Sequence, residues 1–246
     1  MSEGIVVQKC SGIEEFQRCV ALQREIWQEE DLEVEPVTLF VVAAETGGQV
    51  LGAFDGARMV GFTLAVVGFH EGTVYLHSHM TGVLSEYRDR GVGRALKLFQ
   101  REEALGRGIR LIAWTFDPLE TRNGHFNLNR LGAISRKYLP NHYGVTTSPL
   151  HLNLPTDRLL AEWRLDSARA VAAVNELTKG QEDAPAMIEL PAELDGWKQN
   201  DTAQVAKVQT RIREEFANWF ARGYAAVGVR KTATGTAYLL APWSEF

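Results

Sequence analysis

The spacing of apolar residues along the first 36 positions predicts a strand, a helix and a loop. The run 5–8 is short and mostly apolar, as in a strand. Apolar residues then recur three or four positions apart, which predicts an amphipathic helix over residues 13–27. The acidic stretch 29–35, which ends at Pro36, is interpreted as a loop.

A hairpin and further strands and helices follow. Apolar runs at 50–54 and 59–67 flank Asp55-Gly56, and such a pair supplies the positive backbone angles of a tight turn. The later pattern predicts a strand, a helix, a strand, a short helix and a strand at residues 73–83, 91–105, 111–116, 124–131 and 133–139. This order favours the α/β (α+β) class, with a mixed sheet and helices on its faces.

The sequence pattern changes after Ser148, where prolines separate the predicted segments. The pattern there predicts a strand, a loop-rich stretch, a long helix and a hairpin, at residues 159–165, 180–200, 201–222 and 224–240. We therefore expect two domains, residues 1–150 and an α+β extension over 151–246 that packs on the first.

Composition narrows the class of protein without identifying a function. The 246 residues are 45% hydrophobic and 23% charged, as in a folded, soluble protein, and the net charge of −5 argues against nucleic acid as a partner. The two cysteines, Cys10 and Cys19, are too few for a disulfide framework or a four-ligand zinc site. Because neither a signal peptide nor a long apolar run is present, we expect a cytoplasmic protein with no membrane partner.

The segment 83–100 joins a strand to a helix through a short basic turn carrying Arg88, Gly91 and Gly93. The unpaired N–H groups and positive dipole end of a helix N-terminus favour an anion, and glycines let the backbone approach it. The P-loop pattern fails because no Lys followed by Ser or Thr comes after the glycines. The dinucleotide pattern fails because Leu96 replaces its third glycine. A pyrophosphate site and an ordinary charged turn both remain open.

The spacing Arg-x-x-Gly-x-Gly at Arg88, Gly91 and Gly93 resembles the signature of the GNAT superfamily of acyl-coenzyme A dependent N-acyltransferases. The element order over 5–139 and the Leu-Gly segment at 129–133 are similar to that family as well. The resemblance implies acetyl-CoA or another acyl-CoA as co-substrate, and no metal. By position it implies coenzyme A contacts from the strand end, the turn and a later helix: Gly82, Val83, Arg88, Asp89, Arg90, Gly91, Val92, Gly93, Arg94, Asn123 and Asn127.

The strand before the turn carries His77 and His79, which strand alternation would place on one face with Tyr75 and Thr81. Acyl transfer to an amine needs a base, and imidazole titrates near neutral pH. In GNAT enzymes this strand commonly carries that base, and arylalkylamine N-acetyltransferases resemble this chain in having a His-x-His pair. We therefore expect His77, relayed through His79, to deprotonate the amine. The pair could instead be hydrogen-bonded core residues, or part of a metal site with other histidines: His70, His125, His142 and His151.

The resemblance has one gap. Many family members place a tyrosine that protonates the leaving thiolate where this chain has Leu128, among the amides of Asn123, Asn127 and Asn129. An amide can donate a hydrogen bond but is no proton source at neutral pH. Two tyrosines of the following segment are alternatives, although packing roles are the simpler interpretation: Tyr138 and Tyr143. A thiolate can also leave unassisted, because its thiol has a pKa of about 8.5.

These features favour an N-acyltransferase, most simply an N-acetyltransferase, that moves an acyl group directly to a small-molecule amine. The resemblance also allows an N-succinyltransferase acting on amino acids. A catalytically silent coenzyme A binding or sensing module is the alternative from another class, and a dinucleotide oxidoreductase is the third. The extension could shape the acceptor pocket or a homodimer interface.

Overall fold

The computed structural model describes residues 4–27, 34–144, 152–177 and 184–243, and the chain divides into two compact units, residues 1–113 and 114–246. The boundary expected at residue 150 lies inside the second unit, and the expected functional division stays a prediction. No helix in the described ranges has the length and apolar character needed to cross a bilayer.

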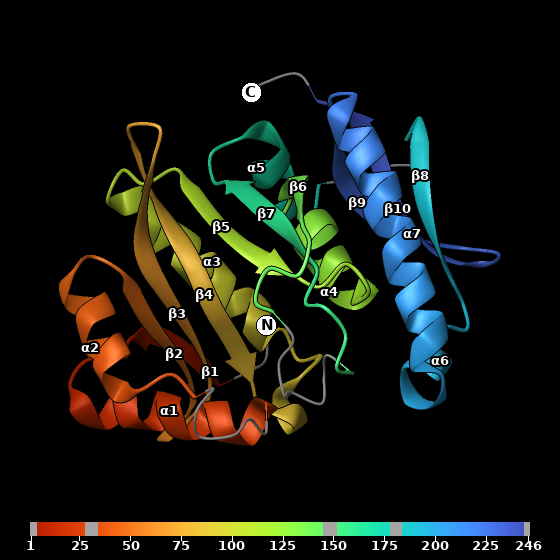
Figure 1. Cartoon of the computed structure of the whole chain (residues 1–246). Helices are drawn as coiled ribbons and strands as arrows, with labels where there is room; N and C mark the ends of the chain where they lie inside the picture. The colour runs from red at the N-terminus through yellow and green to blue at the C-terminus, as the bar shows by residue number, and fades with distance from the viewer. Residues whose placement is uncertain (1–3, 28–33, 145–151, 178–183, 244–246) are drawn as a thin grey trace. The chain divides into compact units, whose positions relative to one another are not determined.

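The first unit is a mixed sheet between helices (Figure 1). Its elements are β1 (Ile5–Lys9), α1 (Ile13–Trp27), α2 (Val37–Glu45), β2 (Gln49–Asp55), β3 (Arg58–His70), β4 (Thr73–Val83), η1 (Ser85–Tyr87), α3 (Val92–Gly106) and the first half of β5 (Leu111–Phe116). The strands lie in sequence order, with antiparallel neighbours from β1 to β4 and a parallel pair between β4 and β5. This confirms the predicted fold class, the helix over 13–27 and the hairpin at Asp55-Gly56.

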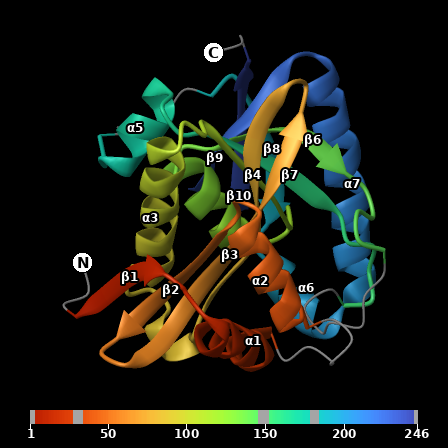
Figure 2. The same cartoon turned by 90° about the vertical axis from the view of Figure 1, so that its left-hand side faces the viewer.

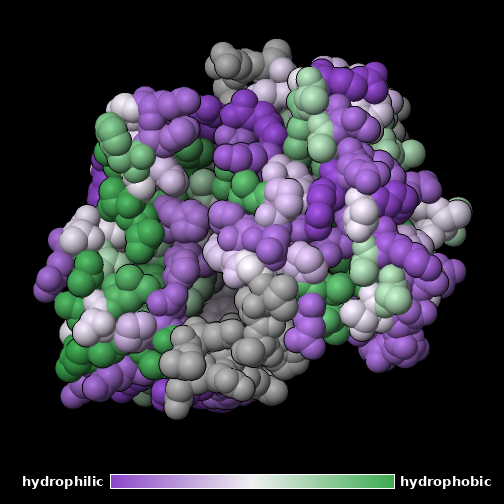
Figure 3. All heavy atoms as spheres, viewed as in Figure 1, coloured by the Kyte–Doolittle hydropathy of each residue, from purple (hydrophilic) through white to green (hydrophobic). Residues whose placement is uncertain are grey.

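The helix α2 was not predicted. Its sequence, VTLFVVAAE, is apolar at nearly every position, so it shows no polar face from which a helical period could be read. It begins directly after Pro36 and buries Phe40 and Ala43, while Val42 is 52% exposed. Figure 3 shows the resulting apolar patch over α2. Most of the acidic loop expected over 29–35 lies outside the described residues; Val34 to Pro36 is irregular, as expected.

The two faces of the first sheet carry different helices. Figure 2 shows α3 on one side of the strands and α1 with α2 on the other. The core on the α1 and α2 side includes Trp27, whose ring meets that of Phe62 edge-on at 6.0 Å, and Phe40, which is fully buried. Burial of such aromatic surface fixes α1 and α2 against the strands.

The second unit is an antiparallel sheet with helices, in strand order β7-β6-β9-β10-β8. Its elements after β5 are α4 (Thr121–His125), the π-helix η2 (Phe126–Arg130), β6 (Ile134–Leu139), β7 (Arg158–Arg164), α5 (Ala168–Val174), β8 (Ala186–Pro191), α6 (Leu194–Asn200), α7 (Thr202–Ala221), β9 (Tyr224–Thr232) and β10 (Gly235–Pro242). The long helix and the closing hairpin are confirmed.

The expectation of a loop-rich stretch over 180–200 was wrong in large part. Residues 180–183 lie outside the described part, but β8 and α6 occupy most of the remainder. Ala186, Ile188 and Leu190 are buried on alternate positions of β8, so the strand period was present. The pattern was hard to recognise because the strand ends at Pro191, and proline usually interrupts a strand. It is tolerated here because β8 is an edge strand of the sheet. The short helix α5 was also missed.

Candidate active site

The N-terminus of α3 is an open, uncapped helix start in the first unit. Gly91 is its N-cap, with φ of 81° and no side chain to cap the first N–H groups. A Cβ atom built at Gly91 would meet nothing within 4 Å, and one at Gly93 would meet only Val83 Cγ2, at 3.9 Å. The main chain is therefore accessible to an anion, and the positive end of a 15-residue helix favours one.

The residues around this helix start divide into exposed and buried groups. Arg88, Asp89 and Arg90 are exposed, Arg94 is half-buried and Val92 points into the core. The guanidinium of Arg90 lies 5.4 Å above the ring of Tyr87, whose hydroxyl donates to Asp55 Oδ2 at 2.8 Å. The Tyr87 ring therefore favours a position of the Arg90 guanidinium beside the turn.

The end of β4 supplies the other predicted contacts. The carbonyl oxygen of Val83 accepts a hydrogen bond from Arg88 Nε at 3.3 Å. Gly82 is buried, and a Cβ there would lie 2.8 Å from both Ile26 Cδ1 and Trp27 Cη2. Only glycine lets α1 approach β4 this closely, whether or not a ligand binds.

A β-bulge at His79 changes which side chains share a face of β4. On β3, Leu64 pairs with Met80 and Ala65 with Ser78, so His79 is the extra residue. Thr81 therefore faces opposite to His77, and the hydroxyls of Thr81 and Thr63 contact each other. The expectation that Thr81 shares a face with His77 was wrong, because the bulge shifts the alternation by one residue.

The two histidines are neighbours, and one contacts a carboxylate. Their ring centroids are 6.4 Å apart. His79 Nε2 lies 2.8 Å from Glu35 Oε1, and both side chains are about one-third exposed, at 31% and 30%. Glu35 is held in turn by the buried side chain of Gln23 on α1. The structure therefore adds Glu35 and Gln23 to the histidine pair, two residues that sequence reasoning missed.

The opposite face of β4 carries a buried amine. Lys97 of α3 is 4% exposed, and its Nζ donates to Ser78 Oγ at 2.7 Å and to Gln100 Oε1 at 3.0 Å. Burial lowers the pKa of Lys97 to about 7. Sequence reasoning missed it because a lysine on an amphipathic helix is normally read as part of the solvent face.

The parallel pairing of β4 with β5 is short. Within the described residues it comprises Leu76 with Ile112 and His77 with Ala113. Ser78 to Val83 of β4 thus extend past the last position paired with β5, while the other edge of this segment pairs with β3. The edge of this segment that faces away from β3 offers N–H and C=O groups to a ligand, and it lies shortly before the α3 turn.

The second unit holds the two predicted asparagines. Asn123 is exposed on α4. Asn127 lies in the π-helix η2 and is 2% exposed, and its Nδ2 has no hydrogen-bond partner within the described residues. A buried amide without an acceptor is costly, so it fits a site completed by a ligand. Asn129 is already engaged, because its Oδ1 accepts from the Val229 N–H at 2.8 Å.

The two tyrosines have different surroundings. The Tyr138 hydroxyl donates to the fully buried carboxylate of Asp157 at 2.7 Å, and burial together with this bond raises the pKa of Tyr138. Tyr143 is 50% exposed, and its hydroxyl lies 2.8 Å from Thr115 Oγ1. The guanidinium of Arg158 lies 5.4 Å above the Tyr143 ring. The buried hydrogen bond to Asp157 gives Tyr138 a structural role, whereas Tyr143 is half exposed.

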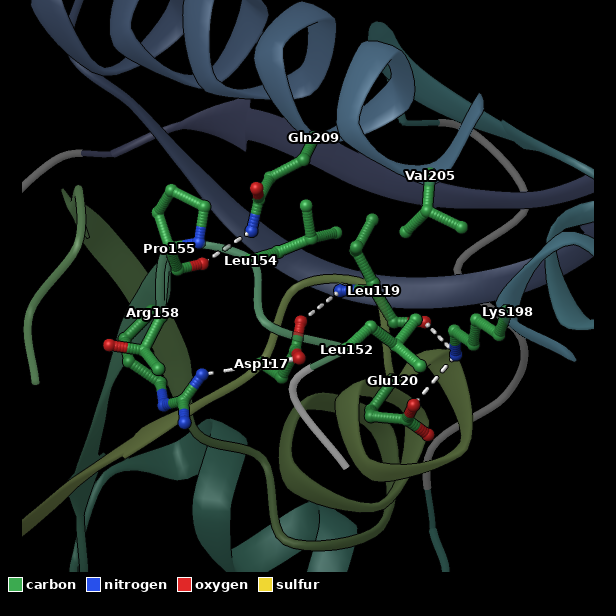
Figure 4. A pocket seen from close by; sticks show the side chains of 11 residues that line it. Asp117, Leu119, Glu120, Leu152, Leu154, Pro155, Arg158, Lys198, Val205 and Gln209 are labelled. Atoms are coloured by element: carbon green, nitrogen blue, oxygen red, sulfur yellow. Dashed lines mark hydrogen bonds and ion pairs between the residues drawn. The ribbon is translucent and has the colours of Figure 1, made fainter. Parts of the chain in front are cut away.

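The end of β5 and the turn after it lie in the second unit. Trp114 is buried, and its ring meets that of Trp163 edge-on at 6.1 Å, as in a core residue. Asp117 accepts a hydrogen bond from the Leu119 N–H at 2.7 Å, and burial raises its pKa. It borders a cavity of about 20 Å³, which Figure 4 shows among Arg158, Lys198 and apolar side chains. That is room for about one water molecule, so this cavity is no substrate site.

The described residues contain no group of three His, Cys, Asp or Glu side chains arranged to hold a metal ion. His151, one of the histidines considered for such a site, lies outside the described residues.

Comparison with known proteins identifies the type of domain. Residues 13–132 match the model of the acetyltransferase (GNAT) family. The chain matches none of the curated proteins.

Many solved structures share the fold. The ribosomal-protein-S18-alanine N-acetyltransferase of Escherichia coli is 13% identical with a TM-score of 0.53, over 67% of this chain and 96% of its own. The yncA protein of Salmonella typhimurium, solved with its cofactor acetyl-CoA, is 15% identical with a TM-score of 0.53, over 68% and 98%. Naa50 of Arabidopsis thaliana, in complex with the bisubstrate analogue CoA-Ac-MVNAL, is 13% identical with a TM-score of 0.52, over 65% and 97%. At these identities the likeness shows the fold alone.

Proposed function

Residues 13–132 of this chain belong to the acetyltransferase (GNAT) family, and from that premise we propose that the protein is an acyl-CoA dependent N-acyltransferase. Acetyl-CoA is the proposed donor, and the amine of a small molecule is the proposed acceptor. The observation that carries the proposal is the open N-terminus of α3, with free space over Gly91 and Gly93, in the turn that follows β4, whose pairing with β5 ends at His77.

The proposed coenzyme A contacts use main-chain groups and arginines. The N–H groups from Gly91 to Arg94 would hold the pyrophosphate, with Arg88 and Arg90 adding charge at the rim. The backbone of Gly82 and Val83 would hydrogen-bond the pantetheine arm. Asn123 and Asn127 lie in the other unit, and the coenzyme A contacts that the family resemblance implies for them stay predictions.

The proposed reaction is a direct transfer. The amine nitrogen forms a bond to the acyl carbon, the carbon–sulfur bond breaks with its electron pair going to sulfur, and the amine proton goes to the His77–His79 pair. The thiolate leaves with its charge and takes a proton from solvent, because Leu128 stands where a tyrosine acid would lie. No acyl-enzyme intermediate is involved.

Titration calorimetry with acetyl-CoA, succinyl-CoA, coenzyme A and NADH, followed by thiol release over a panel of amines, tests the function. We expect coenzyme A binding and release with at least one amine. Binding without release from any amine would favour the silent module, release with succinyl-CoA and amino acids alone would favour the succinyltransferase, and NADH binding would favour the oxidoreductase.

A matched pair of variants tests the anion site. Arg88→Ala with Arg90→Ala should weaken coenzyme A binding about tenfold or more and reduce its dependence on salt. Arg18→Ala with Lys231→Ala removes the same charge elsewhere and should leave the affinity unchanged. Equal losses in both pairs would contradict a site at α3.

A further inference from the structure

A carboxylate outside the histidine strand is directed at one of the two histidines. Glu35 Oε1 lies 2.8 Å from His79 Nε2, which is hydrogen-bonding distance. A carboxylate can only accept, so the ring must donate through Nε2–H. The neutral ring then carries its free lone pair on Nδ1. The contact therefore determines which ring nitrogen can act as a base.

Glu35 is fixed from behind by a buried amide. The Glu35 N–H donates to Gln23 Oε1 at 2.9 Å, and Gln23 Nε2 donates to the Glu35 carbonyl at 3.1 Å. Gln23 itself is fully buried on α1. The next residue, Pro36, is the N-cap of α2 and has a fixed φ near −72°. The main chain at Glu35 is thus held by Gln23 and by its position before Pro36.

Within the described ranges, the groups recorded around His79 are mostly apolar. At the bulge β3 presents Leu64 and Ala65, and the α1 side chains nearest the strand end are Ile26 and Trp27. Among the described residues, the ionisable groups shown against the His79 ring are Glu35 and the ring of His77, whose centroid is 6.4 Å away. The carboxylate of Glu35 is therefore placed to stabilise a positive His79 ring.

We propose that Glu35 is a positioning residue for acyl transfer: it orients His79 so that Nδ1 accepts the amine proton, and Gln23 holds Glu35 in place. This inference rests on the proposed function. In the step, the nitrogen–acyl bond forms, the carbon–sulfur bond breaks, the electron pair leaves on sulfur, and the proton passes from the amine nitrogen to His79 Nδ1. The resulting imidazolium keeps its Nε2–H bond to the carboxylate.

Three variants and one control test the proposal. Glu35→Ala removes both the charge and the hydrogen bond, and Glu35→Gln keeps an acceptor oxygen without the charge. Gln23→Leu fills the buried site with similar volume but releases Glu35. Glu45→Gln, at the exposed end of α2, makes the same charge change away from the histidines.

The kinetic prediction separates positioning from substrate binding. Glu35→Ala should lower kcat about 10- to 100-fold with the amine KM and coenzyme A affinity nearly unchanged, Glu35→Gln should fall between it and the wild type, and Gln23→Leu should follow the same direction. Glu45→Gln should match the wild type. A rise in amine KM at constant kcat would overturn the proposal, because Glu35 would then bind the ammonium of the acceptor.

A measurement that does not depend on activity distinguishes a wrong Glu35–His79 contact from a wrong proposed function. In ¹H–¹⁵N spectra of the full chain, His79 should show a slowly exchanging Nε2–H signal that is lost in Glu35→Ala and kept in Glu45→Gln. Absence of that signal in the wild type overturns the Glu35–His79 contact whatever the turnover. Its presence in a protein that acylates no amine would instead refute the proposed function, and the catalytic role with it.

Discussion

Replacing Lys97 by methionine is expected to stabilise the protein at neutral pH and to destabilise it slightly at high pH. Lys97 is buried on α3, where its Nζ donates to Ser78 Oγ and Gln100 Oε1. Burial lowers its pKa from the usual 10.5 to about 7. Methionine has a similar length and no charge, so the change removes the cost of the buried amine and two hydrogen bonds.

The lowered pKa of Lys97 sets the size and the sign of the change in unfolding free energy. The unfolded chain keeps the Lys97 proton up to about pH 10.5, whereas the folded protein loses it near pH 7. Wild-type stability therefore rises over this range at about 1.4 kcal/mol per pH unit, so the cost at or below pH 7 is about 5 kcal/mol. The two lost hydrogen bonds offset about 2 kcal/mol. The variant should be about 3 kcal/mol more stable at pH 7, equal near pH 9 and about 1 kcal/mol less stable at pH 10.

Urea unfolding of both proteins at pH 7, 8, 9 and 10 measures the difference, in which the titration of all other groups cancels. Hydrogen exchange of the α3 and β4 amides assigns the effect to the first unit, because the two units need not unfold together. A variant that is less stable at every pH, by a constant amount, would refute the reasoning. It would show that the Lys97 amine is charged and compensated in the folded protein at pH 7.

Three further predictions concern the helix start and the second unit. Gly91→Ala should cost about 1 kcal/mol of unfolding free energy, because φ is 81° there, whereas Gly93→Ala should be neutral or slightly stabilising. Thermal melts without ligand compare the two variants, and equal losses of stability would contradict this prediction. Asp157→Asn should cost about 3 kcal/mol, because its buried carboxylate pairs with Arg213 at 2.9 and 3.0 Å, and unchanged urea unfolding would contradict this. Tyr138→Phe should cost about 1 kcal/mol and leave acyl transfer within about twofold, since the raised pKa of Tyr138 makes it a poor acid; a large loss of kcat would show otherwise.

The sequence by itself determined most of the elements and the general location of the candidate site. Amphipathic spacing gave α1 and α7, and Asp55-Gly56 gave the first hairpin, because these signals are local. The turn from Arg88 to Gly93 also reads locally, since a helix start needs only its own glycines and free N–H groups to attract an anion. Elements with a uniform or interrupted pattern were missed, as in α2 and β8.

Tertiary structure alone decided what the side chains of β4 contact. The bulge at His79 depends on the register with β3 and moves Thr81 to the opposite face. Glu35 reaches His79 across a separation of 44 residues, and Gln23 of α1 holds the main chain of Glu35 across 12 residues. Lys97 is buried because α3 turns that position toward Ser78. No local pattern encodes these contacts, since each depends on which distant surface the folded chain brings alongside.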